Sequence, residues 1–132
     1  MDTGRTAMKP TNEDAVEIAR VLALWGHIMD DRELDRLGEV LTEDAVWDAS
    51  AFGLEPAVGL EAVTAVLGAE GHARAHHTTN IVVSDGPGDE VRAQSKGLGV
   101  VDGGTVISAV YTDELRHTAD GWRISKRVIR VN

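Results

Sequence analysis

The second half of the chain places the tightest limit on the fold. After Gly71, four runs of β-favouring residues follow one another, and the short sequences DGPGD, DGG and TADG separate them. Gly- and Asp-rich sequences of this kind are typical of tight turns between neighbouring strands. We therefore predict strands at residues 76–84, 90–101, 105–117 and 122–131, joined as an antiparallel meander.

The first half of the chain has helical periodicity instead. Ile18, Leu22, Trp25 and Met29 recur at the spacing of one helix face, which predicts a bulky apolar stripe on a helix that ends near residue 30. This stripe is expected to pack against the sheet.

A second row at the same spacing consists of Ala19, Ala23, Gly26 and Asp30. Small side chains leave room beside a helix, and this row ends in a carboxylate. We interpret the row as the wall of a pocket that the rest of the chain closes.

Shorter elements are expected between the first helix and the meander. The pattern predicts a second helix at residues 32–40, a short strand that carries Val46 and Trp47, and a third helix at residues 59–70, with the loop AFGLEPAV before the last of these. Helices followed by a block of strands indicate an α+β fold. A long curved sheet around the first helix would form a cone with an open end.

The composition narrows the classes of function. The chain has 132 residues, no cysteine and a formal net charge of −9 at pH 7, with its acids spread along the sequence. It lacks the basic stripe with which proteins contact nucleic acid. Neither a signal peptide nor a membrane-spanning stretch is recognisable, so we expect a cytoplasmic protein without membrane or nucleic-acid partners.

Several stretches carry a family resemblance. The sequences MDDRELDRLGEVLTEDAVWD and YTDELRHTADGWRISKR, together with Gly59 and with His77 and Asn80, resemble the SnoaL-like branch of the nuclear transport factor 2-like superfamily. Its relatives include scytalone dehydratase, ketosteroid isomerase, limonene epoxide hydrolase and polyketide cyclases. The resemblance spans residues 12–131 and implies a cone-shaped α+β barrel, with three N-terminal helices packed in a curved antiparallel sheet.

The same resemblance implies the organisation and partners of the protein. Residues 12–132 are expected to form one SnoaL-like domain after a flexible N-terminal tail of residues 1–11. The expected ligand is a small hydrophobic molecule, no cofactor is implied, and the expected assembly is a homodimer formed through the outer face of the sheet.

Asp30 is the first candidate catalytic residue. It falls where the resemblance places the catalytic helix-one aspartate of scytalone dehydratase, and a carboxylate in an apolar cone can exchange protons with a ligand. A purely structural role is the alternative, because Asp30 and Glu33 also fit a capping box for the second helix. Asp31 fits that cap equally well.

His77 is the second candidate. It matches the strand histidine of scytalone dehydratase through the spacing Arg74-x-x-His77, and a His–Asp pair is a general acid/base unit. Because side chains alternate along a strand, only one of His76 and His77 can face the cavity. We expect His77 to be that residue, with His76 as the alternative. The competing interpretation is that His77 has no catalytic role and is a surface or core histidine.

Asp113 and Tyr111 are candidates for stabilising a ligand oxygen. Asp113 lies eight residues before Gly121, as does the oxyanion-stabilising acid of ketosteroid isomerase before its own turn glycine. Tyr111 shares a strand face with Asp113, and a phenol or protonated acid can donate to an enolate oxygen. A solvated charge on the outer face of the sheet is the competing interpretation of Asp113.

The expected substrate-binding residues are aromatic: Trp25, Trp47, Tyr111 and Phe52. Trp25 and Trp47 could equally be ordinary core residues. Trp25 also stands where ketosteroid isomerase has its catalytic tyrosine, which argues against that reaction in its plain form.

Other departures from the relatives matter as well. The second catalytic histidine of scytalone dehydratase would fall near Val101, and no histidine occurs on that strand. Arg92, Arg127 and Asp113 could contribute to the Asp-Arg-Asp triad of an epoxide hydrolase. We expect no metal site, because the strand separates His76 from His77 and no carboxylate lies at ligand spacing.

Together these features predict a cofactor-independent lyase or isomerase with an Asp–His acid/base pair, acting on a small hydrophobic cyclic or polyketide-like substrate. A non-catalytic small-molecule-binding or accessory protein of the same fold is the alternative, and an epoxide hydrolase is the third hypothesis. An ionisable pair inside the cavity would favour the first, and a purely apolar cavity the second.

Overall fold

The computed structural model describes residues 10–69 and 72–132. Most of the predicted N-terminal tail and the end of the predicted third helix therefore lie outside the described residues. The elements in chain order are α1 (Asn12–Asp30), η1 (Leu34–Glu39), β1 (Leu41–Asp48), η2 (Ser50–Phe52), β2 (Ala57–Val58), α2 (Leu60–Gly68), β3 (Ala75–Asp85), β4 (Val91–Val100), β5 (Val106–Thr118) and β6 (Gly121–Val131).

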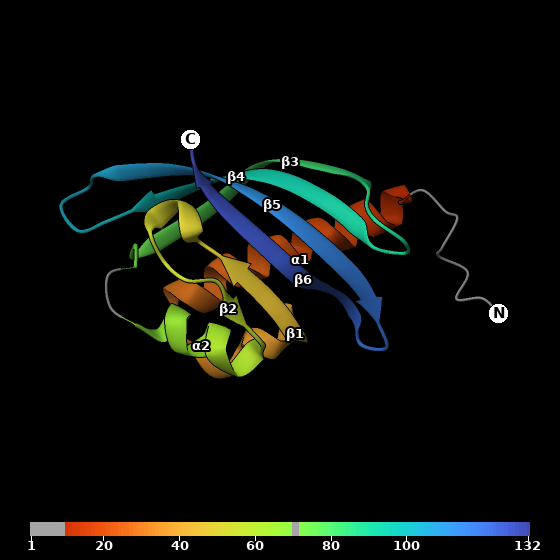
Figure 1. Cartoon of the computed structure of the whole chain (residues 1–132). Coiled ribbons are helices and arrows are strands. Elements are labelled where there is room, and N and C mark those ends of the chain that lie inside the picture. The colour runs from red at the N-terminus through yellow and green to blue at the C-terminus, as the bar shows by residue number, and fades with distance from the viewer. Residues whose placement is uncertain (1–9, 70–71) are drawn as a thin grey trace.

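The strands form one six-stranded sheet in the order β2-β1-β6-β5-β4-β3 (Figure 1). The strands β3 to β6 make the predicted antiparallel meander. The predicted α+β fold is confirmed. The sheet is mixed rather than antiparallel throughout, because β1 adds to β6 in parallel while β2 pairs antiparallel with β1. The parallel pairing joins distant parts of the chain, and no local turn sequence indicates it.

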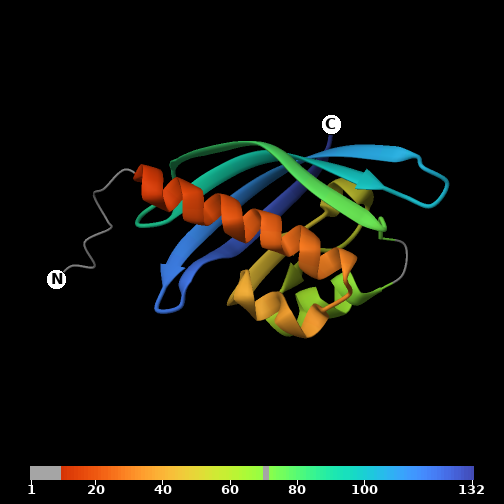
Figure 2. The same ribbon diagram turned by 180° about the vertical axis from the view of Figure 1, so that it is seen from behind.

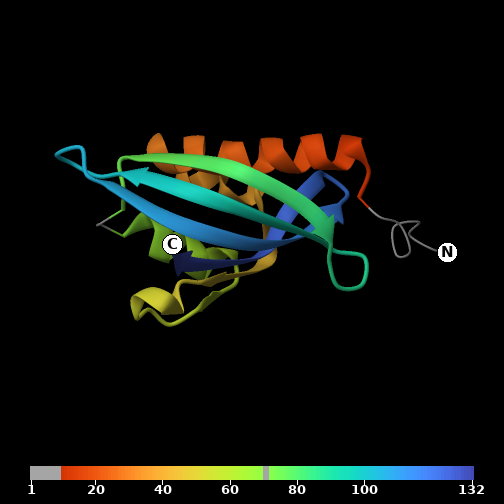
Figure 3. The same ribbon diagram turned by 90° about the horizontal axis from the view of Figure 1, so that it is seen from above.

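The helices cover one face of the curved sheet. Figure 2 shows α1 lying across that face, with η1 and α2 beside its C-terminal half. Viewed from above, β3, β4 and β5 lie side by side and α1 runs along β3 (Figure 3). This arrangement places the C-terminal end of α1 next to the start of β3, where the candidate catalytic residues lie.

Two local predictions need correction. The second helix is the 3-10 helix η1 rather than a regular α-helix. The segment expected as a plain loop contains the 3-10 turn η2 and the short strand β2. Gly38 in η1 is a poor helix former, which favours the shorter element.

The bulky stripe of α1 packs into the core as predicted. Ile18, Leu22, Trp25 and Met29 are all at most 2% exposed. The helix begins with a capping box, in which the Thr11 side chain accepts from the backbone N–H of Asp14 and the Asp14 carboxylate accepts from that of Thr11. Such a box stabilises a helix start by about 1 kcal/mol.

The row of small residues on α1 has a different role from the one predicted. Ala23 is exposed, so this row does not form the cavity wall. Gly26 is buried where α1 crosses β3, and a Cβ there would lie 3.1 Å from the carbonyl oxygen of His76. The small residue therefore permits a close approach of helix and strand.

Candidate functional site

An apolar cavity of about 340 Å³ opens between the C-terminal half of α1, the end of α2 and the concave face of the sheet. This volume lies at the lower end of the range for small-molecule sites. Its lining is largely hydrophobic: Trp25, Trp47, Ala49, Phe52, Leu54, Val66, Leu67, His72, Ala73, His76, Gly97, Gly99, Ile107, Ala109, Tyr111 and Ile129.

Three aromatic side chains form one wall of this cavity. Trp25 and Trp47 stack with their ring centroids 5.6 Å apart, and Tyr111 meets Trp25 edge to face at 5.8 Å. All three are buried, whereas Phe52 is 46% exposed at the rim. The four aromatic residues expected to bind substrate thus line one cavity, and their role in binding stays a prediction.

Asp30 pairs with His76. The ring Nδ1 of His76 lies 2.8 Å from one Asp30 carboxylate oxygen, and the backbone N–H of His76 donates to both oxygens at 2.9 and 3.1 Å. Both side chains are largely sheltered, at 11% exposure for His76 and 27% for Asp30. His76 also meets Trp25 edge to face at 5.1 Å, so its ring stands in the cavity wall.

Neither Asp30 nor Asp31 caps the second helix. No side chain caps η1, and its N-cap position is Glu33. Asp31 is instead the C-cap of α1. Because both Asp30 oxygens accept from His76, the carboxylate serves the strand contact and not a helix cap.

The expectation that His77 faces the cavity was wrong. His77 pairs across the sheet with Leu98, and its side chain is exposed on the face away from α1. His76 pairs with Gly99, which lines the cavity. The alternation of side chains was predicted correctly, but the register that decides which histidine points inward comes from β3 and β4 together.

Asp113 is not the solvated charge that the competing interpretation expected. Both of its oxygens accept from Arg127, from Nε at 2.7 Å and from Nη2 at 2.9 Å, and both side chains are completely buried. A carboxylate held at both oxygens by a guanidinium is an ionised acceptor and has no proton to donate. Burial by itself would lower the pKa of Arg127, but the charge and hydrogen bonds of Asp113 raise it.

Arg127 lies directly beneath the aromatic wall. Its guanidinium carbon is 4.1 Å from the ring centroid of Tyr111, 4.7 Å from that of Trp25 and 5.7 Å from that of Trp47. Within residues 10–69 and 72–132, its Nη1 has no hydrogen-bond partner. Arg127 therefore has one acidic partner, and the Asp-Arg-Asp arrangement of an epoxide hydrolase is not formed by the described residues.

Tyr111 packs directly against a glycine of the neighbouring strand. A Cβ at Gly97 would come within 2.5 Å of the phenol hydroxyl and of two ring carbons. Only glycine leaves space for the ring in this position.

Burial raises the pKa of Tyr111, the cation Arg127 lowers it, and the anion Asp113 raises it, with a net upward shift. The phenol is therefore protonated at neutral pH and can donate a hydrogen bond.

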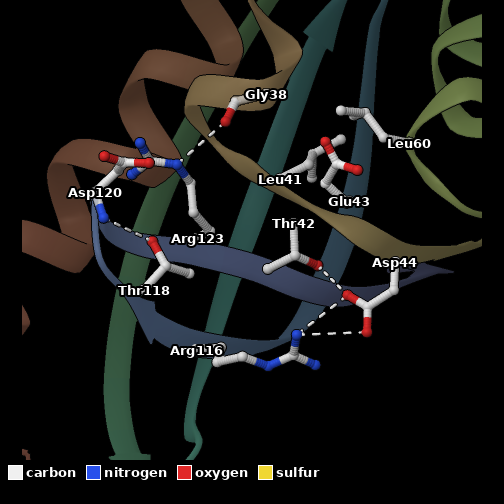
Figure 4. A pocket seen from close by; sticks show the side chains of 10 residues that line it. All are labelled: Gly38, Leu41, Thr42, Glu43, Asp44, Leu60, Arg116, Thr118, Asp120 and Arg123. Atoms are coloured by element: carbon white, nitrogen blue, oxygen red, sulfur yellow. Dashed lines mark hydrogen bonds and ion pairs between the residues drawn. The ribbon is translucent and has the colours of Figure 1, made fainter.

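The surface carries other hollows, of which Figure 4 shows one of about 470 Å³. It shares no residue with the apolar cavity. Arg116, in its wall, donates to Asp44 at 3.1 Å and to Glu90 at 3.3 Å, and Thr42 also donates to Asp44. These charges satisfy one another, so we place the candidate site in the apolar cavity.

No cluster of three or more His, Asp or Glu side chains suited to a metal ion occurs in the part of the chain that the structure describes. Within the same residues, no helix is long and apolar enough to cross a membrane.

Comparison with known families agrees with the geometry. The SnoaL-like domain family matches residues 10–128. The chain therefore belongs to the SnoaL-like domain family, as the sequence resemblance predicted. A comparison with curated proteins finds no match.

Solved structures of several bacterial proteins share this fold. A Novosphingobium aromaticivorans protein, provisionally named an aromatic ring hydroxylase, is 28% identical with a TM-score of 0.76 over 92% of this chain and 90% of its own. A Nostoc punctiforme protein of unknown function with a cystatin-like fold is 23% identical, with a TM-score of 0.82 over 95% and 96%. A second N. aromaticivorans protein, provisionally named a scytalone dehydratase, is 19% identical, with a TM-score of 0.74 over 92% and 89%.

Sequence reasoning gave Arg127 only a minor place in the site. The register of β5 and β6 places Arg127 opposite Asp113 and next to Trp47 of β1. The sequence around Arg127 does not distinguish it, because Lys126 precedes it and Arg123 and Arg130 lie on the same strand. Its burial and its acidic partner follow from the pairing of the strands.

Proposed function

We propose that this protein is a cofactor-independent lyase or isomerase that moves protons on a small hydrophobic cyclic or polyketide-like ketone. The observation that carries the proposal is the 2.8 Å contact between Asp30 and the His76 ring in the wall of an apolar cavity. Membership of the SnoaL-like family supports it, since that fold includes dehydratases and isomerases among its relatives.

The Asp30–His76 pair supplies the base. Because a carboxylate accepts hydrogen bonds, His76 Nδ1 carries the proton of this contact, and Nε2 of the neutral ring keeps a free lone pair. Asp30 fixes this tautomer and stabilises the imidazolium that forms when Nε2 takes a proton. The backbone N–H of His76 holds the same carboxylate in place.

Tyr111 supplies the hydrogen-bond donor. Nε2 of His76 removes a proton from the carbon next to a carbonyl group, and the carbonyl oxygen that becomes an enolate accepts a hydrogen bond from the Tyr111 hydroxyl. The imidazolium then returns the proton, either to another carbon in an isomerisation or to a departing hydroxyl group in a dehydration. Both outcomes balance protons and need no cofactor.

We do not propose Asp113 as the hydrogen-bond donor that its sequence position suggests. Its carboxylate is engaged by Arg127, so we assign it to positioning Arg127 beneath the aromatic wall. Trp25, Trp47 and Phe52 would enclose the hydrophobic body of the ligand.

Proton exchange in deuterium oxide tests the proposal even while the product is unidentified. A panel of cyclic ketones and hydroxyketones is incubated with the protein, and NMR follows the loss of signals from protons next to the carbonyl. Enzyme-dependent exchange that is lost in His76→Ala supports the proposal. Ligands that quench the tryptophan fluorescence but show no exchange would favour the non-catalytic binding protein instead. That second candidate is favoured by the mostly apolar lining of the cavity.

We also propose that two copies pair through the outer face of the sheet. Val82, Leu98 and Val106 are exposed on β3, β4 and β5, at 64%, 38% and 55%. Their strand neighbours face α1, so these three side chains lie on the opposite, outer face. Analytical ultracentrifugation would show a dimer that dissociates in Leu98→Glu; a monomer at all concentrations would contradict it.

A further inference from the structure

Arg127 is a completely buried cation, paired with Asp113. The ion pair alone does not explain why a cation is kept in the core. Replacing a buried ion pair by apolar residues is often neutral or stabilising, so such a pair is weak evidence of a need for stability. Nη1 of Arg127 also lacks a hydrogen-bond partner among the described residues, which carries a further cost. A second role would account for retaining this cation.

The position of Arg127 indicates that role. The guanidinium carbon stands 4.1 Å from the centroid of the Tyr111 ring, closer than to either tryptophan ring. A cation over an aromatic face is attracted to the ring, and the attraction grows as the ring gains negative charge. Tyr111 gains negative charge as its hydroxyl donates to a developing enolate.

Asp113 holds the cation in this position. The two hydrogen bonds to Asp113 fix the plane of the guanidinium, and cross-strand pairing of Asp113 with Arg127 fixes the side chains on the concave face. On the other side, Gly97 leaves the space that the Tyr111 ring occupies. The ring is thus held between a glycine and a cation.

We propose that Arg127 is a positioning residue that increases the acidity of Tyr111 through the face of its ring and so strengthens the phenol as a hydrogen-bond donor. This inference rests on the proposed function for its catalytic meaning, but its electrostatic part stands on the geometry alone. Among the described residues, the other titratable groups around Tyr111 are Asp113 on its own strand and the two histidines that line the same cavity, His72 and His76, the second of which pairs with Asp30 of α1. Ser95 and Gly97 of β4 are uncharged.

The sequence offers a clean probe, because Tyr111 is the only tyrosine in the chain. Biosynthetic replacement by 3-fluorotyrosine therefore labels this one position, and fluorine also lowers the phenol pKa into a range where proteins stay folded. A ¹⁹F NMR titration then reads the pKa of residue 111 directly.

The test variant is Asp113→Leu combined with Arg127→Met, which removes both charges and keeps the apolar volume. The matched control is Glu114→Leu combined with Lys126→Met, a cross-strand pair one position along on the outer face. We expect the test variant to raise the pKa of residue 111 by about one unit relative to the unmodified site, because the cation that is lost lies against the ring face and lowers this pKa by more than Asp113 raises it. The control should leave the pKa unchanged.

An unchanged or lower pKa in the test variant would overturn the inference, provided that circular dichroism shows the variant folded. If it does not fold, Arg127→Lys is the second test, since it keeps a positive charge but loses the planar contact with the ring face, and it should raise the pKa by less than about one unit. An unchanged or lower pKa in that variant would contradict the role of the stacked guanidinium. A shifted pKa together with no proton exchange in the unmodified protein would refute the proposed function and leave the electrostatic coupling intact.

Discussion

The pair of neighbouring histidines permits a sharp test of the acid/base assignment. The His76 ring lies in the cavity wall and contacts Asp30 behind it, whereas His77 is exposed on the outer face of the sheet. We predict that His76→Ala and Asp30→Asn each lower the rate of proton abstraction by about a hundredfold, which corresponds to about 2.7 kcal/mol of transition-state stabilisation. His77→Ala and Asp31→Asn, one residue along in each case, should leave the rate unchanged.

The magnitude for Asp30→Asn follows from its three contacts. The carboxylate accepts from both the ring and the backbone N–H of His76. An amide keeps only one acceptor oxygen, and its NH2 group would set a donor against the backbone N–H of His76 in place of the second oxygen, which weakens the orientation of the ring. It also carries no charge to stabilise the imidazolium. Loss of orientation and loss of charge each account for about a factor of ten.

A nitrobenzisoxazole provides the assay, because its ring opens to a coloured phenolate when a base removes its one acidic C–H proton. The molecule is flat and hydrophobic, as the walls formed by Trp25 and Trp47 require. Absorbance then reports proton abstraction whatever the natural substrate is. Equal rates in His76→Ala and His77→Ala would refute the assignment of His76 as the base.

Three further predictions follow from the packing around the site. Gly26→Ala should lower activity several-fold without raising stability, since the added methyl meets the His76 carbonyl at 3.1 Å; kinetics and thermal unfolding test this. Asp113→Ala should cost about 3–5 kcal/mol by leaving Arg127 unpaired, whereas Asp113→Leu with Arg127→Met should recover most of that in urea denaturation. Tyr111 has a folded-state pKa above 10.0, so the unfolded chain loses that proton first and stability falls as pH rises past about 10. Tyr111→Phe should show a shallower alkaline decline in melting temperature.

The fold was largely predictable because its signals are local. Tight-turn sequences fix the hairpins between β3, β4, β5 and β6, and helical spacing fixes the buried side of α1. The parallel pairing of β1 with β6 depends on contacts between distant segments, such as Trp47 with Arg127. No nearby residue encodes such a pairing, so sequence reasoning did not find it.

The site was only partly predictable for the same reason. Asp30 was chosen because the family resemblance places a carboxylate at the end of the first helix, and its role in catalysis stays a prediction. The choice between His76 and His77 depends on register, since His76 faces inward only when it stands opposite Gly99. A shift of one residue would exchange the two faces. The pairing of Asp113 with Arg127 likewise follows from β5–β6 register rather than from either residue alone.

A crystal structure of the protein with a bound cyclic enolate analogue, such as a hydrophobic phenol, tests the central claim most directly. The account predicts that the ring lies in the apolar cavity against Trp25 and Trp47, with its oxygen within hydrogen-bond distance of the Tyr111 hydroxyl and with Nε2 of His76 facing the ring. Binding in another hollow, or a ligand oxygen that contacts neither Tyr111 nor His76, would contradict it.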